Sequence, residues 1–207
     1  MLPVDRVKPA IIPLVLMLIL LAGCATSPHG ADGFVRPPQA YLPLNTEGLE
    51  PGLAVLYLKH NFVRSLDLLP QGEKAREKGQ PGPPIPYLNH QFGRSLIFDS
   101  GTNRGIGMEI SGFIRLEHPG TYGFQANSND GFRLYIDGQR LVDDPDWHSD
   151  RLSPEGRLSI TEPGWYSLRC RYFQRKGTAT IQLYWQPPGE NEFTIVPAKV
   201  LAHQQSY

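Results

Sequence analysis

The sequence predicts an all-β fold, a two-sheet antiparallel β-sandwich, for the chain after residue 52. Three observations predict it. Several runs alternate apolar and polar residues with a period of two, turn dipeptides containing Gly separate these runs, and the 207 residues include 21 Gly and 20 Pro. A period of two gives each strand one dry and one wet face. Several short strands at this spacing are typical of a sandwich.

The predicted domain spans residues 53–203, and a strand-like run over 53–58 opens it. The next stretch, residues 70–86, is charged and then rich in Pro and Gly. We therefore expect a long surface loop there, which is either functional or mobile.

The clearest alternation follows Gly105. The residues predicted to face the core are Tyr122, Phe124 and Ala126, then Phe132, Leu134 and Ile136, then Tyr166, Leu168, Cys170 and Tyr172, and finally Ile181, Leu183 and Trp185. Trp165 is also expected in the core. The dipeptide Asp137-Gly138 separates two of these runs, which predicts a tight hairpin.

The N-terminus has the order of a secretory leader: a short polar start, an apolar run over 11–20 and then small residues. The apolar run is too short for a spanning helix, and Pro13 interrupts it. The segment Leu21-Ala22-Gly23-Cys24 resembles the lipobox of bacterial lipoproteins. That resemblance implies removal of residues 1–23 as a signal peptide and attachment of fatty acids such as palmitate to Cys24. The alternative is an ordinary signal peptide with an incidental Cys.

Residues 24–52 are rich in Pro and poor in aliphatic side chains, which predicts a flexible tether between the lipid and the domain. Ala25, in place of the Asp that usually retains lipoproteins in the inner membrane, favours the outer membrane. If Cys24 is acylated, Cys170 has no disulfide partner. We expect Cys170 to be an inert buried thiol.

Acidic and basic residues balance at 20 each, so no net charge draws the chain to nucleic acid, and no nucleic-acid partner is predicted. The sequence has no Gly-x-Ser-x-Gly elbow and no His-Glu-x-x-His motif. We therefore predict that the protein is not an enzyme. A glycosidase pair among its carboxylates remains the catalytic alternative, because their separation depends on the fold.

Five motifs follow one another along the domain. They are Gly120-Thr-Tyr-Gly-Phe, Ser128-Asn-Asp-Gly-Phe-Arg-Leu-Tyr-Ile-Asp-Gly138, Gly164-Trp-Tyr-Ser-Leu, Tyr172-Phe and Leu183-Tyr-Trp185. This succession resembles the protective-antigen fourteen-kilodalton domain family, β-sandwiches found in anthrax protective antigen, yeast flocculin adhesins and many glycoside hydrolases. The resemblance is dense from about residue 112 to residue 201.

In the sugar-binding adhesins of that family, two consecutive acidic residues before a Gly hold calcium through a cis peptide, and the ion takes sugar hydroxyls. The matching residues here are Asn129 and Asp130. Their amide and carboxylate oxygens suit calcium. The resemblance places the remaining ligands in the loop over 174–177, where Arg175 and Lys176 oppose a cation. The alternative is that the pair caps a turn through bonds to the backbone.

A second polar cluster lies over residues 143–150, where alternation would place Asp144, Asp146, His148 and Asp150 on one side of an extended segment. Asp144 and Asp146 are candidate calcium ligands, whereas His148 favours a transition metal. The alternative is a solvated loop held by a buried Trp147.

Aromatic rings can stack on the C–H face of a sugar. The candidate carbohydrate-binding residues are Asn129, Asp130, Tyr135, Trp147 and Tyr184. A basic stripe of Arg169, Arg171, Arg175 and Lys176 is either a solvated sheet face or a contact for an anionic polysaccharide.

The sequence therefore predicts a lipoprotein that is anchored in the outer membrane through acylated Cys24 and binds carbohydrate or another envelope component. Calcium is its candidate cofactor. The alternative is a structural or protein-interaction module of an envelope assembly, without a sugar site.

Overall fold

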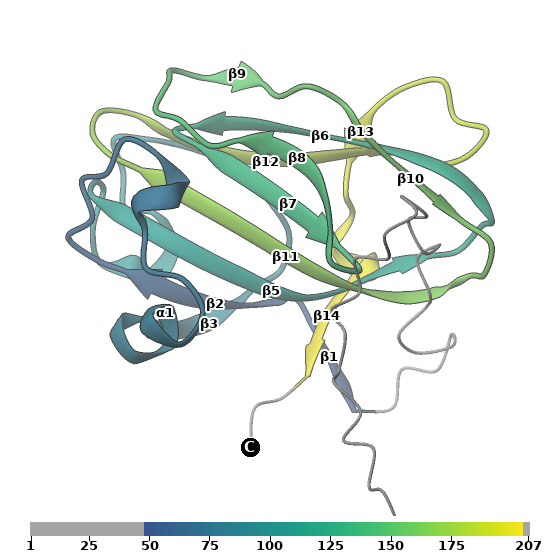
Figure 1. The fold of residues 1–207 in the computed structure, drawn as a ribbon, viewed down its shortest axis with the longest axis horizontal. Coiled ribbons are helices and arrows are strands. Elements are labelled where there is room, and N and C mark those ends of the chain that lie inside the picture. The colour runs from purple at the N-terminus through teal and green to yellow at the C-terminus, as the bar shows by residue number, and fades with distance from the viewer. Residues whose placement is uncertain (1–47, 205–207) are drawn as a thin grey trace, which may run out of the picture. The chain divides into compact units, whose positions relative to one another are not determined.

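The computed structural model describes residues 48–204, which form two antiparallel β-sheets packed face to face (Figure 1). The eight-stranded sheet contains β1 (Leu49–Pro51), β2 (Leu53–Leu58), β3 (Gln80–Ile85), β5 (Ile106–Leu116), β7 (Phe132–Ile136), β8 (Gln139–Asp144), β11 (Gly164–Gln174) and β14 (Leu201–Gln204). The six-stranded sheet contains β4 (Asn89–Gly93), β6 (Gly120–Asn129), β9 (Arg151–Leu152), β10 (Gly156–Ile160), β12 (Ala179–Gln186) and β13 (Thr194–Ile195). The predicted all-β sandwich is confirmed.

Strands distant in sequence lie side by side in both sheets. The order in the larger sheet is β1-β14-β5-β11-β7-β8, with β2 paired to β5 and β3 paired to β2. The order in the smaller sheet is β10-β6-β12-β13, with β4 on β12 and β9 on β6. The short helices are α1 (Glu73–Lys78) and the 3-10 turns η1 (Leu66–Leu68), η2 (Phe98–Ser100) and η3 (Ala198–Val200).

The core fills the space between the two sheets. All thirteen side chains predicted to face inward on β6, β7, β11 and β12 are buried in it, so the alternation was interpreted correctly. Cys170 is a free thiol and is completely buried, and burial raises its pKa well above its ordinary value. Trp185 belongs to this core. Trp165 is also buried, in a smaller cluster with Phe113 and Ala202.

The hairpin predicted at Asp137-Gly138 joins β7 to β8. Both residues have positive φ, 49° and 74°, and Ile136 pairs with Gln139 across the turn. Positive φ at both central residues matches the twist of the flanking strands and favours Gly at the second position. The predicted tight hairpin is confirmed.

Residues 70–86 are not the long loop that the sequence predicted. They contain α1, whose residues are mostly good helix formers, and β3, which pairs with β2 alone. Three prolines in β3 obscured the strand, but an edge strand tolerates proline because one row of its N–H groups needs no partner. Gly82 is required there, since a Cβ atom would lie 2.3 Å from the Tyr57 ring.

The sheet begins earlier than predicted, because β1 lies within the segment expected to be tether. Leu49 to Pro51 pair with β14, whose last residue is Gln204. The leader, Cys24 and the tether before residue 48 lie outside the described residues. Among residues 48–204, no helix has the length and hydrophobicity needed to cross a membrane.

Candidate functional site

The predicted ligand turn lies at the end of the sandwich where β6 passes into β7. Asn129 ends β6, Asp130 follows it, and both side chains are buried. The peptide bond between them is cis, the isomer that the family resemblance implies for this pair. A Cβ atom on the next residue, Gly131, would lie 2.6 Å from the carbonyl oxygen of Pro145. The turn therefore packs directly against the loop between β8 and β9.

The Asp130 carboxylate connects two other loops to this turn. Its Oδ1 accepts a hydrogen bond from the backbone N–H of His148 (3.2 Å), and its Oδ2 accepts one from the backbone N–H of Arg175 (2.6 Å). The residue is 4% exposed. Burial raises the pKa of the carboxyl, while the two N–H groups and the charges of His148 and Arg175 oppose that rise. Asp130 thus joins loop β8–β9 to loop β11–β12.

Asn129 is held by its amide nitrogen and by its backbone. Its Nδ2 donates to Thr178 Oγ1 (3.1 Å), and its carbonyl oxygen accepts from the Tyr172 hydroxyl (2.6 Å). Its Oδ1 makes no hydrogen bond within residues 48–204. Asn129 Oδ1 and the second lone pairs of the Asp130 oxygens are hard donors of the kind calcium prefers.

The other two predicted calcium ligands do not join this pair. Asp144 is buried and accepts hydrogen bonds from the Arg151 guanidinium through both oxygens, and His148 Nε2 lies 3.2 Å from its Oδ2. Asp146 is exposed. Within the described part of the chain, no three His, Cys, Asp or Glu side chains are grouped to hold a metal ion. Asp144 is therefore paired with the Arg151 guanidinium, and of the four candidate ligands only Asn129 and Asp130 are adjacent.

The loop over 174–177 does lie beside the turn, as the resemblance implies, but it contributes an N–H group to Asp130 rather than an oxygen. The Arg175 guanidinium is directed elsewhere, because its Nε donates to the carbonyl oxygen of Phe62 (3.2 Å). A cavity of about 390 Å³ borders the same loop and is lined by Arg94, Asn103, Arg104 and Gly177. This end of the sandwich therefore offers a basic, polar recess near the candidate turn.

The aromatic candidates are dispersed over three surfaces. Trp147 is 56% exposed in loop β8–β9, with the Arg64 guanidinium 5.5 Å from the centre of its ring. The alternative prediction of a buried Trp147 was wrong. The backbone N–H of Trp147 donates to the carbonyl oxygen of Arg64, so the neighbouring segment holds the backbone of the loop while the indole ring stays exposed. Tyr135 lies on the outer face of the larger sheet, 4.3 Å beneath the Arg169 guanidinium. Tyr184 lies on the outer face of the smaller sheet.

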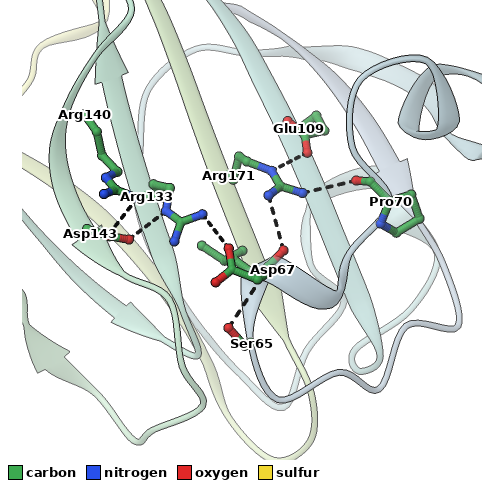
Figure 2. Close-up of polar contacts among 9 residues, drawn as sticks. Ser65, Asp67, Pro70, Glu109, Arg133, Arg140, Asp143 and Arg171 are labelled. Carbon is green, nitrogen blue, oxygen red and sulfur yellow. Dashed lines mark hydrogen bonds and ion pairs between the residues drawn. The ribbon is translucent and has the colours of Figure 1, made fainter.

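Sequence reasoning missed a network of ion pairs around two buried arginines on the outer face of the larger sheet, shown in Figure 2. Arg133 is 5% exposed and binds Asp143 (2.6 Å) and Asp67 (2.9 Å). Arg171 is 2% exposed and binds Glu109 (2.5 Å). Arg171 was expected on a solvated basic stripe, and this was wrong.

The reason is a segment over residues 59–72 that crosses this face and includes η1. Arg171 donates to its carbonyl oxygens at Leu66 (3.2 Å) and Pro70 (3.1 Å) (Figure 2). Beneath it, Phe173 packs with Leu66 and Leu69. Alternation along β11 indicates which face a residue occupies, but it carries no signal for a distant segment that covers that face.

A model of the PA14 domain matches residues 89–199, more than half of the chain. The chain belongs to the PA14 domain family. The match begins well before residue 112, so β4 and β5 are part of the family domain as well.

Comparison with known proteins places this PA14 domain beside proteins of different kinds. Anti-sigma-I factor RsgI3 of Acetivibrio thermocellus is 27% identical over 92 residues, which are 44% of this chain and 14% of that protein. The epithelial adhesin 6 A domain of Candida glabrata, solved in complex with Galb1-3GlcNAc, superposes with a TM-score of 0.64 at 10% identity and covers 84% of this chain and 95% of its own. An anti-sigma factor domain-containing protein from Clostridium clariflavum gives 0.61 at 20% identity over 76% of this chain and 49% of its own.

The chain thus spans a small part of RsgI3 and about half of the Clostridium clariflavum protein. Both solved structures are less than 25% identical to this chain, so the two matches show a shared fold alone.

Proposed function

We propose that this PA14 domain is a non-catalytic carbohydrate-binding module of the bacterial envelope. The observation that carries the proposal is the Asn129–Asp130 turn, which sets a buried carboxylate and an amide oxygen side by side at the loop end of the sandwich. The recess lined by Arg94, Asn103 and Arg104 adjoins the same loops. The Candida glabrata adhesin of the same fold, solved with a disaccharide, supports this function.

Calcium is the proposed cofactor of the turn. Asn129 Oδ1 and one Asp130 oxygen fit the ion chemically, and calcium takes about six to eight oxygen ligands. Most of its ligands would therefore come from water, backbone carbonyls or sugar hydroxyls. One carboxylate supplies less charge than two, and a buried carboxylate that already accepts two N–H bonds has fewer lone pairs to offer. Both facts predict weak binding.

A calcium titration of the melting temperature tests the cofactor. A ligand that binds only the folded state stabilises it by mass action. We expect millimolar calcium to raise the melting temperature of the wild type, Asp130→Ala to lose this rise, and Asn129→Asp to enlarge it by adding a second charge. If calcium shifts the melting temperature of none of the three proteins, calcium is not a cofactor of this turn.

A metal-independent interaction module is the second candidate, and the hydrogen bonds of Asp130 favour it. Both carboxylate oxygens already accept backbone N–H groups, as expected of a residue that only joins loops. In that case Asp130→Ala would cost about 1–3 kcal/mol with or without calcium, because two buried N–H groups lose their acceptor. The same titration therefore separates the two candidates.

The proposal also includes anchoring of the domain to the outer membrane through acylated Cys24. The support is the Leu21-Ala22-Gly23-Cys24 segment after an apolar run. A single acyl chain binds membranes only marginally and two or more give stable anchoring. We expect Cys24→Ser to remove the lipid and release the protein from the membrane fraction, as measured by fractionation and mass spectrometry. A Cys24→Ser protein that stays in the outer-membrane fraction at the wild-type level would refute the anchor.

A further inference from the structure

The outer face of the six-stranded sheet has an unusual composition. Its outward positions on β4, β6 and β12 carry no charged side chain; they are Asn89, Gln91, Gly93, Thr121, Gly123, Gln125, Asn127, Asn129, Thr180, Gln182, Tyr184 and Gln186. The nearest charges are paired. Arg151 binds Asp144, and Arg157, the strand partner of Gly123, binds Glu155, whose Oε1 would lie 3.1 Å from a Cβ atom on Gly123. Charged side chains are mostly exposed on protein surfaces, so a sheet face whose outward side chains are mainly neutral amides suggests a function other than solvation.

The amides of this face are held in fixed orientations by one another. Asn127 Nδ2 donates to Gln182 Oε1 (2.9 Å), and Gln182 Nε2 donates to Asn89 Oδ1 (2.6 Å). Gln125 Nε2 donates to the carbonyl oxygen of Ser153 (3.2 Å). Within residues 48–204, Asn127 Oδ1 and Asn89 Nδ2 make no further hydrogen bond. The face therefore presents an acceptor and a donor that are already ordered before any ligand arrives.

Apolar rings adjoin the amide field. Tyr184 lies between Gln125 and Ile195 in the register of β6, β12 and β13. Phe193 lies over Gly123, where an added Cβ atom would be 2.8 Å from its ring. Tyr184, Phe193 and Ile195 are all half-buried. Each of the three side chains therefore packs against the sheet and exposes the rest of its surface to solvent.

We infer that this face, here named the amide face and consisting of the outward residues of β4, β6 and β12 other than Asn129, together with Phe193 and Ile195, is a second binding surface for a neutral polysaccharide chain. This inference rests on the proposed carbohydrate-binding function. Sugar hydroxyls donate and accept, as amides do, and sugar C–H faces stack on aromatic rings. Side chains ordered in advance lose little entropy on binding.

The lack of an unpaired charge selects the class of ligand. A polyuronate or sulfated chain would have to bury its anions against neutral amides, and the nearest guanidinium, that of Arg157, is already paired with Glu155, so this burial is costly. A neutral chain has no such cost. From Thr180 to Gln186 the face extends for about 20 Å along β12, at roughly 3.3 Å per residue. It therefore suits an extended chain better than a single sugar.

Isothermal titration calorimetry of the full chain in detergent tests the amide face. The probes are three neutral polymers, dextran, galactomannan and xyloglucan, with anionic alginate as the comparator. We expect the wild type to bind at least one neutral polymer. Tyr184→Ala should weaken that binding roughly tenfold or more, because it removes the stacking ring, and Tyr184→Phe should keep it. The control is Leu68→Ala, which removes an exposed apolar side chain of η1 on the segment that crosses the other sheet and should bind as the wild type does.

The outcomes separate this inference from the proposed function. Binding lost in Asp130→Ala but kept in Tyr184→Ala would place the sugar at the loop end, overturn the amide face and leave the proposed function standing. Binding to alginate alone, or to none of the four polymers, would also overturn the amide face. If Tyr184→Ala fails to fold, amide chemical shifts of the wild type decide. Changes confined to β4, β6 and β12 support the inference, and changes confined to the loops refute it.

Discussion

The two outer faces of this sandwich differ in charge and in what covers them. On the larger sheet, Asp143, Arg133, Arg171 and Glu109 form one cross-strand row, and the segment over 59–72 lies on the two arginines (Figure 2). On the smaller sheet, neutral amides bond to one another. The chain's own residues 59–72 cover the charged face. On the amide face, Asn89 and Gln91 are exposed, and Gln125, Asn127, Tyr184 and Gln186 are half-buried.

The difference shows two uses of a polar sheet face. Buried guanidinium groups need all their partners, and here those partners are carboxylates and carbonyl oxygens that fasten a crossing segment to the sheet. Neutral amides tolerate partial solvation and keep hydrogen-bonding capacity for a ligand. We therefore expect substitutions on the charged face to affect folding, and those on the amide face to affect binding.

The largest expected effect is that of Arg171→Met. It leaves the Glu109 carboxylate and the carbonyl oxygens of Leu66 and Pro70 without their donor, and breaking a buried ion pair costs about 3–5 kcal/mol. Urea unfolding measures the loss. The matched control is Arg169→Met, two residues away and exposed, which loses only its contact with the Tyr135 ring and should cost no more than about 1 kcal/mol. Equal losses in both variants would contradict a structural role for the charged face.

A smaller loss is expected from Cys170→Ser in the core shared by both sheets. The thiol is fully buried among apolar side chains, and a hydroxyl there costs about 1–3 kcal/mol. The same unfolding curves measure it. An unchanged unfolding midpoint would mean that the thiol is not buried in solution.

Asp67→Asn should cost less again. Asp67 binds the buried Arg133 but is itself largely exposed, so solvent screens the pair and the loss should be at most about 1 kcal/mol. Because salt also screens exposed pairs, the difference from the wild type should shrink at 1 M salt. A loss that does not depend on salt would indicate that η1 is held by packing and backbone bonds alone.

The smallest effect on stability is expected from Gln125→Ala on the amide face. Its half-buried side chain makes one hydrogen bond, to the carbonyl oxygen of Ser153, and such changes stay within about 0.5 kcal/mol. Thermal unfolding checks this. A loss comparable to that of Arg171→Met would show that the amide face is structural as well, and the contrast between the faces would fail.

Much of this fold followed from the sequence because period-two alternation is a local signal. It predicted the inward residues of β6, β7, β11 and β12 and the Asp137-Gly138 hairpin, all of which the structure contains. The sequence analysis failed where contacts between distant segments determine the structure. The prolines of β3 concealed that strand, because a strand tolerates proline only at the edge of a sheet, and the sequence does not show which strand lies at the edge. The burial of Arg171 depends on a segment about 100 residues away in the chain.

The candidate site was predictable in part, for the same reason. A motif located Asn129 and Asp130, and the turn they form binds the loop that the resemblance assigned to it. Tyr135 and Tyr184 look alike in the sequence because each faces outward on its own strand. Only the pairing of β7 with β11, and of β12 with β6, assigns them to opposite sheets.

The most direct test of carbohydrate binding is a glycan-array screen of the full chain in detergent, with and without millimolar calcium. We predict binding to neutral glycans, retained by Leu68→Ala on the segment that covers the charged face. Binding of no glycan under either condition would contradict the proposed function, and the metal-independent interaction module would then be the better account of this PA14 domain.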